Sequence, residues 1–282
     1  MLIDTHCHLD ADEFSVDRDA MIQASIVSGV DVMVVPSVEA ANFQTVIDLS
    51  NVYPQICYAL GIHPMYVDNA VEADLELLKT LIAKKLDHKL VAVGEIGLDF
   101  FVTTHNWEKQ EYFFAEQLKI ARLFDLPVIL HVRKSSDIIL KHLRKIKVCG
   151  GIAHAFNGSR QQADELIKLG FKLGFGGAMT HTRALHIREL AKNLPIASIV
   201  LETDSPDIPP QWLLKSPANN LQISEIKLGK PRNTPAELKQ IARVLGEIRH
   251  ENTAHIVVNT GANACQVLPK LSSLYTSLNV NC

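Results

Sequence analysis

Short apolar runs alternate with longer amphipathic stretches along this chain, and the alternation leaves few folds open. Such a pattern is expected where parallel strands are joined by crossover helices. Eight runs have strand length, and they cover residues 1–8, 30–38, 56–63, 90–97, 127–132, 150–156, 171–177 and 197–204. Candidate helices lie between them, such as residues 107–124, where apolar side chains recur at helical spacing.

The runs are apolar along nearly their whole length, which indicates burial on both faces of a parallel sheet. Eight strand–helix units in 282 residues match the size of a closed barrel, so we predict an α/β protein with a single (β/α)8 TIM-barrel domain over residues 1–282. An open doubly wound sheet is the alternative, but the first run is not followed by the G-x-G-x-x-G of a dinucleotide site. The Pro-rich segment 205–234 is predicted to be a long loop.

Composition restricts the partners and the compartment. Lys plus Arg number 28 against 31 for Asp plus Glu, so a global basic field is excluded and any contact with nucleic acid must be local. Five scattered cysteines without a C-x-x-C pair indicate reduced thiols. Because no apolar run approaches the ~18 residues of a membrane span and the start lacks a signal-peptide pattern, we expect a cytoplasmic protein with no membrane contact and no obligate protein partner.

His6 and His8 are one residue apart on a predicted strand, so both imidazoles face the same side and Cys7 faces the other. A single histidine here would more often form a hydrogen bond in the core, but a pair at this spacing favours a metal. Further candidate ligands stand at the ends of other predicted strands: Glu95, His131, His154 and Asp204. In a barrel, these strand ends meet at one mouth.

Four histidines and two carboxylates exceed the three or four protein ligands of one catalytic zinc, so we predict two divalent metal ions. We assign His6, His8 and Asp204 to one ion and His131 and His154 to the other, with Glu95 between them; a bridge by water alone is the alternative. Two such ions, ~3.5–4 Å apart, lower the pKa of a water between them and polarise a phosphoryl or carbonyl oxygen. Zinc, manganese and magnesium all stay open as the metal.

Two acidic residues have predicted roles beside the metals. Asp204 is our candidate to accept the proton of the attacking water, the alternative being a ligand only. Glu202, two residues earlier on the same face, is a candidate to orient a ligating histidine or to form an ordinary buried ion pair.

An ordered set of motifs closely resembles the TatD family of metal-dependent hydrolases. The motifs are DTHCHLD from Asp4, GIHP at 61–64, VGEIGLDF at 93–100, PVILHVR at 127–133, HAFNGS at 154–159, LETDSP at 201–206 and RNTP at 232–235. The resemblance implies a barrel of the metallo-dependent hydrolase type and the same six ligands. It also implies a deoxyribonuclease with 3′-to-5′ exonuclease activity, whose substrate is DNA ends.

The resemblance further suggests that His63 lies beside the substrate, although a structural histidine bonded to the backbone is the alternative. Arg133 is a candidate to bind a phosphate oxygen, or else to pair with Asp99 or Asp137. Asn157 and Ser159 are weaker candidates for substrate binding, since N-G-S is also an ordinary turn sequence.

The chain departs from its relatives in the segment 205–234, where residues 216–229 resemble an insertion. Trp212 in this segment either stacks on a base or packs against the barrel rim. The leading function is hydrolysis of a phosphodiester in single-stranded or frayed DNA. The alternatives are an amidohydrolase-like or aminoacyl-ester hydrolase with the same two metals and, less favoured, a metal-stabilised scaffold without catalysis.

Overall fold

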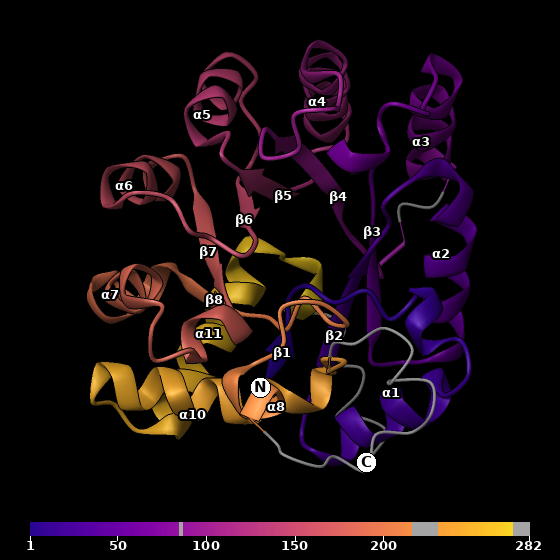
Figure 1. Cartoon of the computed structure of the whole chain (residues 1–282). Coiled ribbons are helices and arrows are strands. Elements are labelled where there is room, and N and C mark those ends of the chain that lie inside the picture. The colour runs from indigo at the N-terminus through magenta and orange to yellow at the C-terminus, as the bar shows by residue number, and fades with distance from the viewer. Residues whose placement is uncertain (85–86, 216–230, 273–282) are drawn as a thin grey trace.

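The computed structural model describes residues 1–84, 87–215 and 231–272, and these residues form a ring of parallel strands surrounded by helices (Figure 1). The eight strands pair in chain order in one sheet. They are β1 (Ile3–Asp4), β2 (Val32–Pro36), β3 (Ile56–Leu60), β4 (Leu90–Asp99), β5 (Val128–Arg133), β6 (Gly151–Ala153), β7 (Phe171–Phe175) and β8 (Ile199–Leu201). The predicted α/β barrel is therefore confirmed.

Most helices follow a strand and lie outside the ring (Figure 1). The α-helices are α1 (Arg18–Val27), α2 (Phe43–Val52), α3 (Glu72–Lys84), α4 (Trp107–Leu123), α5 (Ser136–Lys145), α6 (Arg160–Lys168), α7 (Leu185–Asn193), α8 (Gln211–Lys215), α10 (Leu238–Arg249) and α11 (Thr253–Val267). Short 3-10 helices are η1 (Asp12–Phe14), η2 (Ala40–Asn42), η3 (Pro64–Tyr66), η4 (Gly177–Thr180), η5 (Ile196–Ser198) and η6 (Pro235–Glu237).

The predicted helix at 107–124 corresponds to α4. Asn106 precedes it, and its side-chain oxygen accepts a hydrogen bond from Lys109 N at 3.0 Å, which satisfies one of the free amides at the start of the helix. The apolar stripe of α4, including Phe113, Phe114 and Leu118, is buried. The periodicity of the sequence therefore locates this helix correctly.

The first and last strands close the ring through hydrogen bonds of the residues that follow them. Thr5 N donates to Leu201 O at 3.0 Å, and Asp204 N donates to His6 O at 2.9 Å. The segments after β1 and β8 thus run together at the carboxyl ends of the strands. This seam fixes the backbone of two predicted metal ligands.

Two layers of apolar side chains alternate along the strands. In β2, Met33 and Val35 belong to the layer between the sheet and the outer helices, whereas Val32 and Val34 belong to a second cluster. This second cluster also contains the α11 residues Ala264 and Val267, and the α11 residue Asn263 donates to Ile199 O at the start of β8. Helix α11 therefore covers the amino ends of the strands, and the polar residues gather at the other end.

Gly97 allows close contact between β4 and β5 beside the predicted ligands Glu95 and His131. Its φ is +149°, and a Cβ at this position would lie 2.1 Å from His131 O. The register of β4 against β5 shifts between Val93 and Ile96. A side chain at position 97 would separate the strands that carry both ligands.

The predicted loop at 205–234 contains helix α8. Residues 216–229, which the sequence predicts to be an insertion, lie outside the described residues. Trp212 in α8 packs against the core and its Nε1 donates to Glu237 Oε2 at 2.6 Å. Cys7, Cys57, Cys149 and Cys265 are free thiols. In the described parts of the chain, none of the helices has the length and apolar character needed to cross a membrane. A single domain over residues 1–282 stays a prediction.

Candidate metal centre

The six predicted ligands come together at the carboxyl ends of the strands. Glu95 lies in β4 and His131 in β5, and the others directly follow a strand: His6 and His8 after β1, His154 after β6 and Asp204 after β8. The predicted strand over residues 1–8 is wrong in its extent, because β1 ends at Asp4. His6 and His8 nevertheless face the same side, with 3.1 Å between their Nε2 atoms, whereas Cys7 is buried with its Sγ 3.6 Å from Val34 O.

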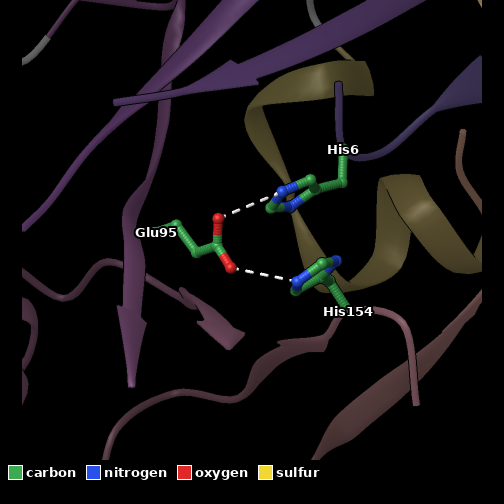
Figure 2. Close-up of side chains that lie close together, drawn as sticks. All are labelled: His6, Glu95 and His154. Carbon is green, nitrogen blue, oxygen red and sulfur yellow. Dashed lines mark ion pairs between the residues drawn. The ribbon is translucent and has the colours of Figure 1, made fainter. Parts of the chain in front are cut away.

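Glu95 faces the imidazoles of both His6 and His154, one with each carboxylate oxygen (Figure 2). Its Oε2 is 3.2 Å from His6 Nε2 and 3.5 Å from His8 Nε2. Its Oε1 is 3.0 Å from His154 Nε2 and 3.1 Å from His131 Nδ1. The two carboxylate oxygens therefore face two different pairs of imidazoles, which is the arrangement required of a carboxylate shared by two cations.

Asp204 approaches the first histidine pair from the neighbouring segment after β8. Its Oδ1 lies 3.5 Å from His6 Nε2 and 3.8 Å from His8 Nε2. Its backbone φ is +56°, a left-handed conformation that a non-glycine residue rarely adopts. Lys134 and Ala155, which follow β5 and β6, also have positive φ values. Strained residues of this kind gather where a fold presents functional side chains.

Burial and neighbouring groups both change the pKa values of the clustered side chains. Burial disfavours ionisation of Glu95, but the surrounding histidines His154, His63 and His6 hold its pKa well below the usual value. Burial, helped by the neighbouring His154, lowers the pKa of His6 well below its usual value. Burial likewise lowers the pKa of His63 to about 4. At three other imidazoles burial is outweighed by nearby carboxylates, which raise the pKa values of His8, His131 and His154. A cation that binds here must therefore displace protons from these rings.

The hydrogen-bond pattern also fits a metal. Asp99, which the sequence analysis did not assign to the site, accepts a hydrogen bond from His131 Nε2 at 3.0 Å. With Nε2 donating to Asp99, His131 Nδ1 lies 3.1 Å from Glu95 Oε1, and either a proton on Nδ1 or a cation between the two atoms satisfies both of them. Nδ1 of His6 and of His154 are buried without a hydrogen-bond partner in the described structure.

Three groups of side chains have ligand atoms within 4.8 Å of one another: His6 with Glu95 and His154; His6 with His8 and Asp204; and His63 with Glu95 and His131. A mixed set of imidazoles and carboxylates suits zinc, manganese and other transition ions. The residues present therefore fit a divalent metal, whose number and identity stay predictions.

His63 lies closer to the centre than its predicted place beside the substrate implies. Its Nε2 is 3.4 Å from Glu95 Oε1, and its Nδ1 accepts a hydrogen bond from Met65 N at 3.2 Å. Both suggested environments are thus present, since one ring nitrogen is bonded to the backbone and the other faces the site. The position of His63 directly after β3 is the sequence signal that could have indicated this.

Asp99 also stands at the end of a strand. Burial opposes its charge, but the hydrogen bond from His131 and the amides of Phe101 and Val102 lower the pKa of Asp99 to about 2. It is the last residue of β4, the strand that carries Glu95. Asp99 therefore orients the His131 ring as an acceptor on its far side.

Glu202 and Arg133 lie beside the centre. Glu202 is buried, its Oε1 accepts a hydrogen bond from Ala155 N at 2.5 Å, and the same oxygen is 3.7 Å from His154 Nδ1. The half-exposed Arg133 has its Nη1 3.8 Å from Asp99 Oδ2, the pairing raised as one alternative in the sequence analysis. Glu202 thus lies on the outer side of the candidate ligand His154, and Arg133 lies beside Asp99, the partner of His131.

The remaining candidates lie on the rim. Ser159 caps helix α6, and its Oγ accepts a hydrogen bond from Gln162 N at 3.1 Å. Asn157 is exposed in the same turn. The geometry of Ser159 and Asn157 identifies no ligand for either residue, so their contact with substrate stays a prediction.

A parallel β/α barrel with imidazoles and carboxylates clustered at its carboxyl mouth defines the class of metallo-dependent hydrolases. Residues 3–269 match the family model of TatD-related DNases, and the chain therefore belongs to the TatD family of metal-dependent hydrolases. The resemblance seen in the sequence motifs is thus confirmed.

The chain is 39% identical over 279 residues to the uncharacterized metal-dependent hydrolase YjjV of Escherichia coli (strain K12), covering 99% of this chain and 98% of the relative. The crystal structure of that TatD homologue matches with a TM-score of 0.85 over 95% of this chain and 98% of that chain, at 38% identity. A protein of Klebsiella pneumoniae (strain 342) named 3′-5′ ssDNA/RNA exonuclease TatD is 30% identical over 265 residues, covering 93% of this chain and 95% of the relative.

Proposed function

We propose that this hydrolase is a metal-dependent phosphodiesterase that removes nucleotides from the 3′ ends of single-stranded DNA. The observation that carries the proposal is the central Glu95, whose two oxygens each face a separate pair of imidazoles. Two cations held side by side suit an in-line displacement at phosphorus. The named activity of the exonuclease relative supports the choice of nucleic acid as substrate.

The proposed ligands divide around Glu95. His6, His8 and Asp204, whose ligand atoms lie within 4.8 Å of one another, would hold one cation. His131 and His154, whose ring nitrogens lie 3.1 and 3.0 Å from Glu95 Oε1, would hold the other, with Glu95 shared. When bound, divalent cations supply the positive charge that acidifies water and stabilises the negative charge developing on a phosphoryl oxygen. Asp99 and Glu202 keep the rings of His131 and His154 oriented from their outer sides.

Asp204 is the proposed proton acceptor. Its Oδ1 faces the His6 and His8 pair, and its side chain is 14% exposed against 2% for Glu95, so Asp204 can meet a water entering from the mouth. A carboxylate at this position can accept a proton from the attacking water and pass it to solvent. His63 faces the second group and is proposed to contact the substrate oxygen held there.

Arg133 supplies positive charge at the rim for a phosphate oxygen. Asn157 and Ser159 are proposed to donate hydrogen bonds to the same backbone. These contacts matter because the net charge of −3 leaves the surface without a general attraction for a polyanion.

The test is digestion of 3′-end-labelled single-stranded DNA by the purified protein with Mg²⁺, Mn²⁺ or Zn²⁺. The wild type should release labelled nucleotide, and Asp204→Asn should be slower by roughly 10²–10⁴-fold, as expected for the loss of a general base. Equal digestion by wild type and variant would show a contaminating nuclease. If the wild type digests no DNA with any metal but hydrolyses an aminoacyl ester or an amide from the same panel, the function is hydrolysis at a carbonyl instead.

A further inference from the structure

Two exposed cations at the end of β5 share one aromatic ring. The guanidinium carbon of Arg133 lies 3.8 Å from the centroid of the Phe101 ring, and Lys134 Nζ lies 4.8 Å from it. Phe101 is 49% exposed, as is the side chain of Arg133. Within the described part of the chain, no carboxylate oxygen lies within 4.0 Å of Lys134 Nζ.

The positive charges of Arg133 and Lys134 thus lie close together, although like charges repel each other. The face of an aromatic ring attracts cations and so offsets part of their mutual repulsion. Lys134 adopts a φ of +55°, a conformation that is costly for a residue with a side chain. The Phe101 ring thus holds two charged groups at the surface with their donors available to an anion.

The cation pair lies next to the candidate metal centre. The same atom, Asp99 Oδ2, is 3.0 Å from His131 Nε2 and 3.8 Å from Arg133 Nη1. Phe101 is held to this carboxylate through its amide, which donates to Asp99 Oδ1 at 2.9 Å. The Asp99 carboxylate therefore lies between His131, a proposed metal ligand, and the Arg133 guanidinium.

The other side of the mouth has the opposite charge. Tyr66 in η3 lies beside His63, with 6.2 Å between the ring centroids. Burial raises the pKa of Tyr66, and nearby carboxyl groups raise it further; these are Glu39, Asp10, Glu13 and Asp12. Carboxyl groups thus gather on the segments that follow β1 and β2, whereas two cations stand at the end of β5.

We propose that Arg133 and Lys134, held by Phe101, bind the phosphate next to the one that is cleaved, so that a single-stranded nucleic acid leaves the mouth over β4 and β5. The site recognises a phosphodiester backbone by charge and is indifferent to base identity. Phe101 is a positioning residue, since it acts through the two cations. The inference rests on the proposed function for the identity of the substrate.

The test is equilibrium binding of a fluorescein-labelled oligothymidylate of roughly 12 nucleotides, long enough for one strand-binding groove. Binding is measured by anisotropy to the full chain in EDTA, where no turnover occurs. The double variant Arg133→Gln/Lys134→Gln should bind roughly tenfold more weakly than the wild type at low salt, as expected for two exposed ionic contacts. Lys141→Gln, which removes an exposed charge from helix α5, should bind as the wild type does.

Salt dependence separates phosphate contacts from a structural effect. Each phosphate neutralised on a single strand contributes about 0.7 to the slope of log K against log salt, so the double variant, which loses the cations bound to one phosphate, should lose about 0.7 from the slope. Phe101→Leu keeps both charges, and we expect it to weaken binding severalfold with the slope nearly unchanged.

Two outcomes overturn the inference: an affinity and slope of the double variant equal to those of the wild type, or no measurable binding by the wild type. The proposed function is judged separately, by hydrolysis of bis(4-nitrophenyl) phosphate by the metal-loaded wild type. Because this diester has a single phosphate, failure to hydrolyse it or DNA defeats the proposed function, while the binding comparison still decides the role of Arg133 and Lys134.

Discussion

The carboxylate of Glu202 fills the space that the missing side chain of Gly174 leaves open, because a Cβ on Gly174 would lie 2.1 Å from Glu202 Oε2. Gly174 lies in β7, and Glu202 directly follows β8. In this position Glu202 accepts a hydrogen bond from Ala155 N and lies 3.7 Å from His154 Nδ1. A glycine on one strand thus fixes the acid that supports a candidate metal ligand on another.

Gly174→Ala should therefore weaken metal binding without unfolding the barrel. The added methyl group meets the Glu202 side chain first, so the carboxylate must move away from His154. Loss of a partner that orients a ligating histidine typically costs roughly 10–100-fold in metal affinity or activity. Titration with Zn²⁺, followed by elemental analysis of the dialysed protein, measures this loss.

Gly170→Ala is the matched control, because it adds the same methyl group just before β7. Its nearest neighbour would be 3.6 Å away, and its φ of +87° makes the change a cost in stability only. Metal affinity should be unchanged in this variant. Wild-type affinity in Gly174→Ala would contradict the role assigned to Glu202.

Asp99→Asn should impair the metal centre through the tautomer of His131. The Asp99 carboxylate accepts from His131 Nε2, which leaves Nδ1 free to face Glu95. An amide nitrogen in place of Oδ2 would donate to Nε2 and place the ring proton on Nδ1. We expect metal affinity to fall roughly 10–100-fold, measured by the same titration.

The control for this variant is Asp164→Asn, which alters a half-exposed carboxylate paired with Arg160 on helix α6. This change should leave metal affinity as it is. Unchanged affinity in Asp99→Asn would show that the His131 ring is oriented by packing alone.

The sequence predicts the barrel and the set of candidate ligands because both depend on local patterns. Runs of apolar residues locate all eight strands, and His6, His8, Glu95 and Asp204 stand out as polar residues at the ends of such runs. The extent of β1 is overestimated, because the residues from Thr5 onward form hydrogen bonds with the segment around β8 that no local pattern reveals.

Contacts between strands are what the sequence leaves out. Asp99 reaches His131 because β4 and β5 pair with Gly97 opposite His131, a register that passes through an irregularity after Val93. The fit of Glu202 against Gly174 likewise depends on the positions of two different strands. The family resemblance supplies the ligands but gives no information about these supporting contacts.

Asp17→Asn should destabilise the fold in a pH-dependent manner. Arg232 donates to both oxygens of Asp17, at 2.8 and 2.6 Å, and thereby joins the segment after residue 230 to the start of helix α1. The hydrogen bond from Arg232 lowers the pKa of Asp17. The ion pair therefore stabilises the fold above the unfolded pKa of about 3.9, and this stabilisation is lost as the pH falls through the lower folded value.

We expect Asp17→Asn to lower the free energy of unfolding by about 0.5–1 kcal/mol at neutral pH, the upper range for a partly exposed pair. Urea unfolding of wild type and variant at several pH values should show the two curves converging below about pH 4. A difference that stays constant with pH would mean that packing of the side chain, and not its charge, is responsible.

Metal binding should raise the thermal stability of the wild type and fail to do so when the first histidine pair is removed. His6 and Glu95 are buried with 3.2 Å between Nε2 and Oε2, and both atoms can bind a cation, so a metal that binds only the folded chain stabilises it. At a concentration 100-fold above the Kd, such a ligand stabilises the fold by about 2.7 kcal/mol, which for a chain of this size raises Tm by roughly 5–10 °C. Differential scanning fluorimetry with EDTA, Zn²⁺ or Mn²⁺ measures the shift.

His255→Gln, at an exposed histidine of helix α11, should keep the full shift, whereas His6→Ala/His8→Ala should lose most of it. An equal shift in all three proteins would place the bound metal elsewhere and remove these two histidines from the centre.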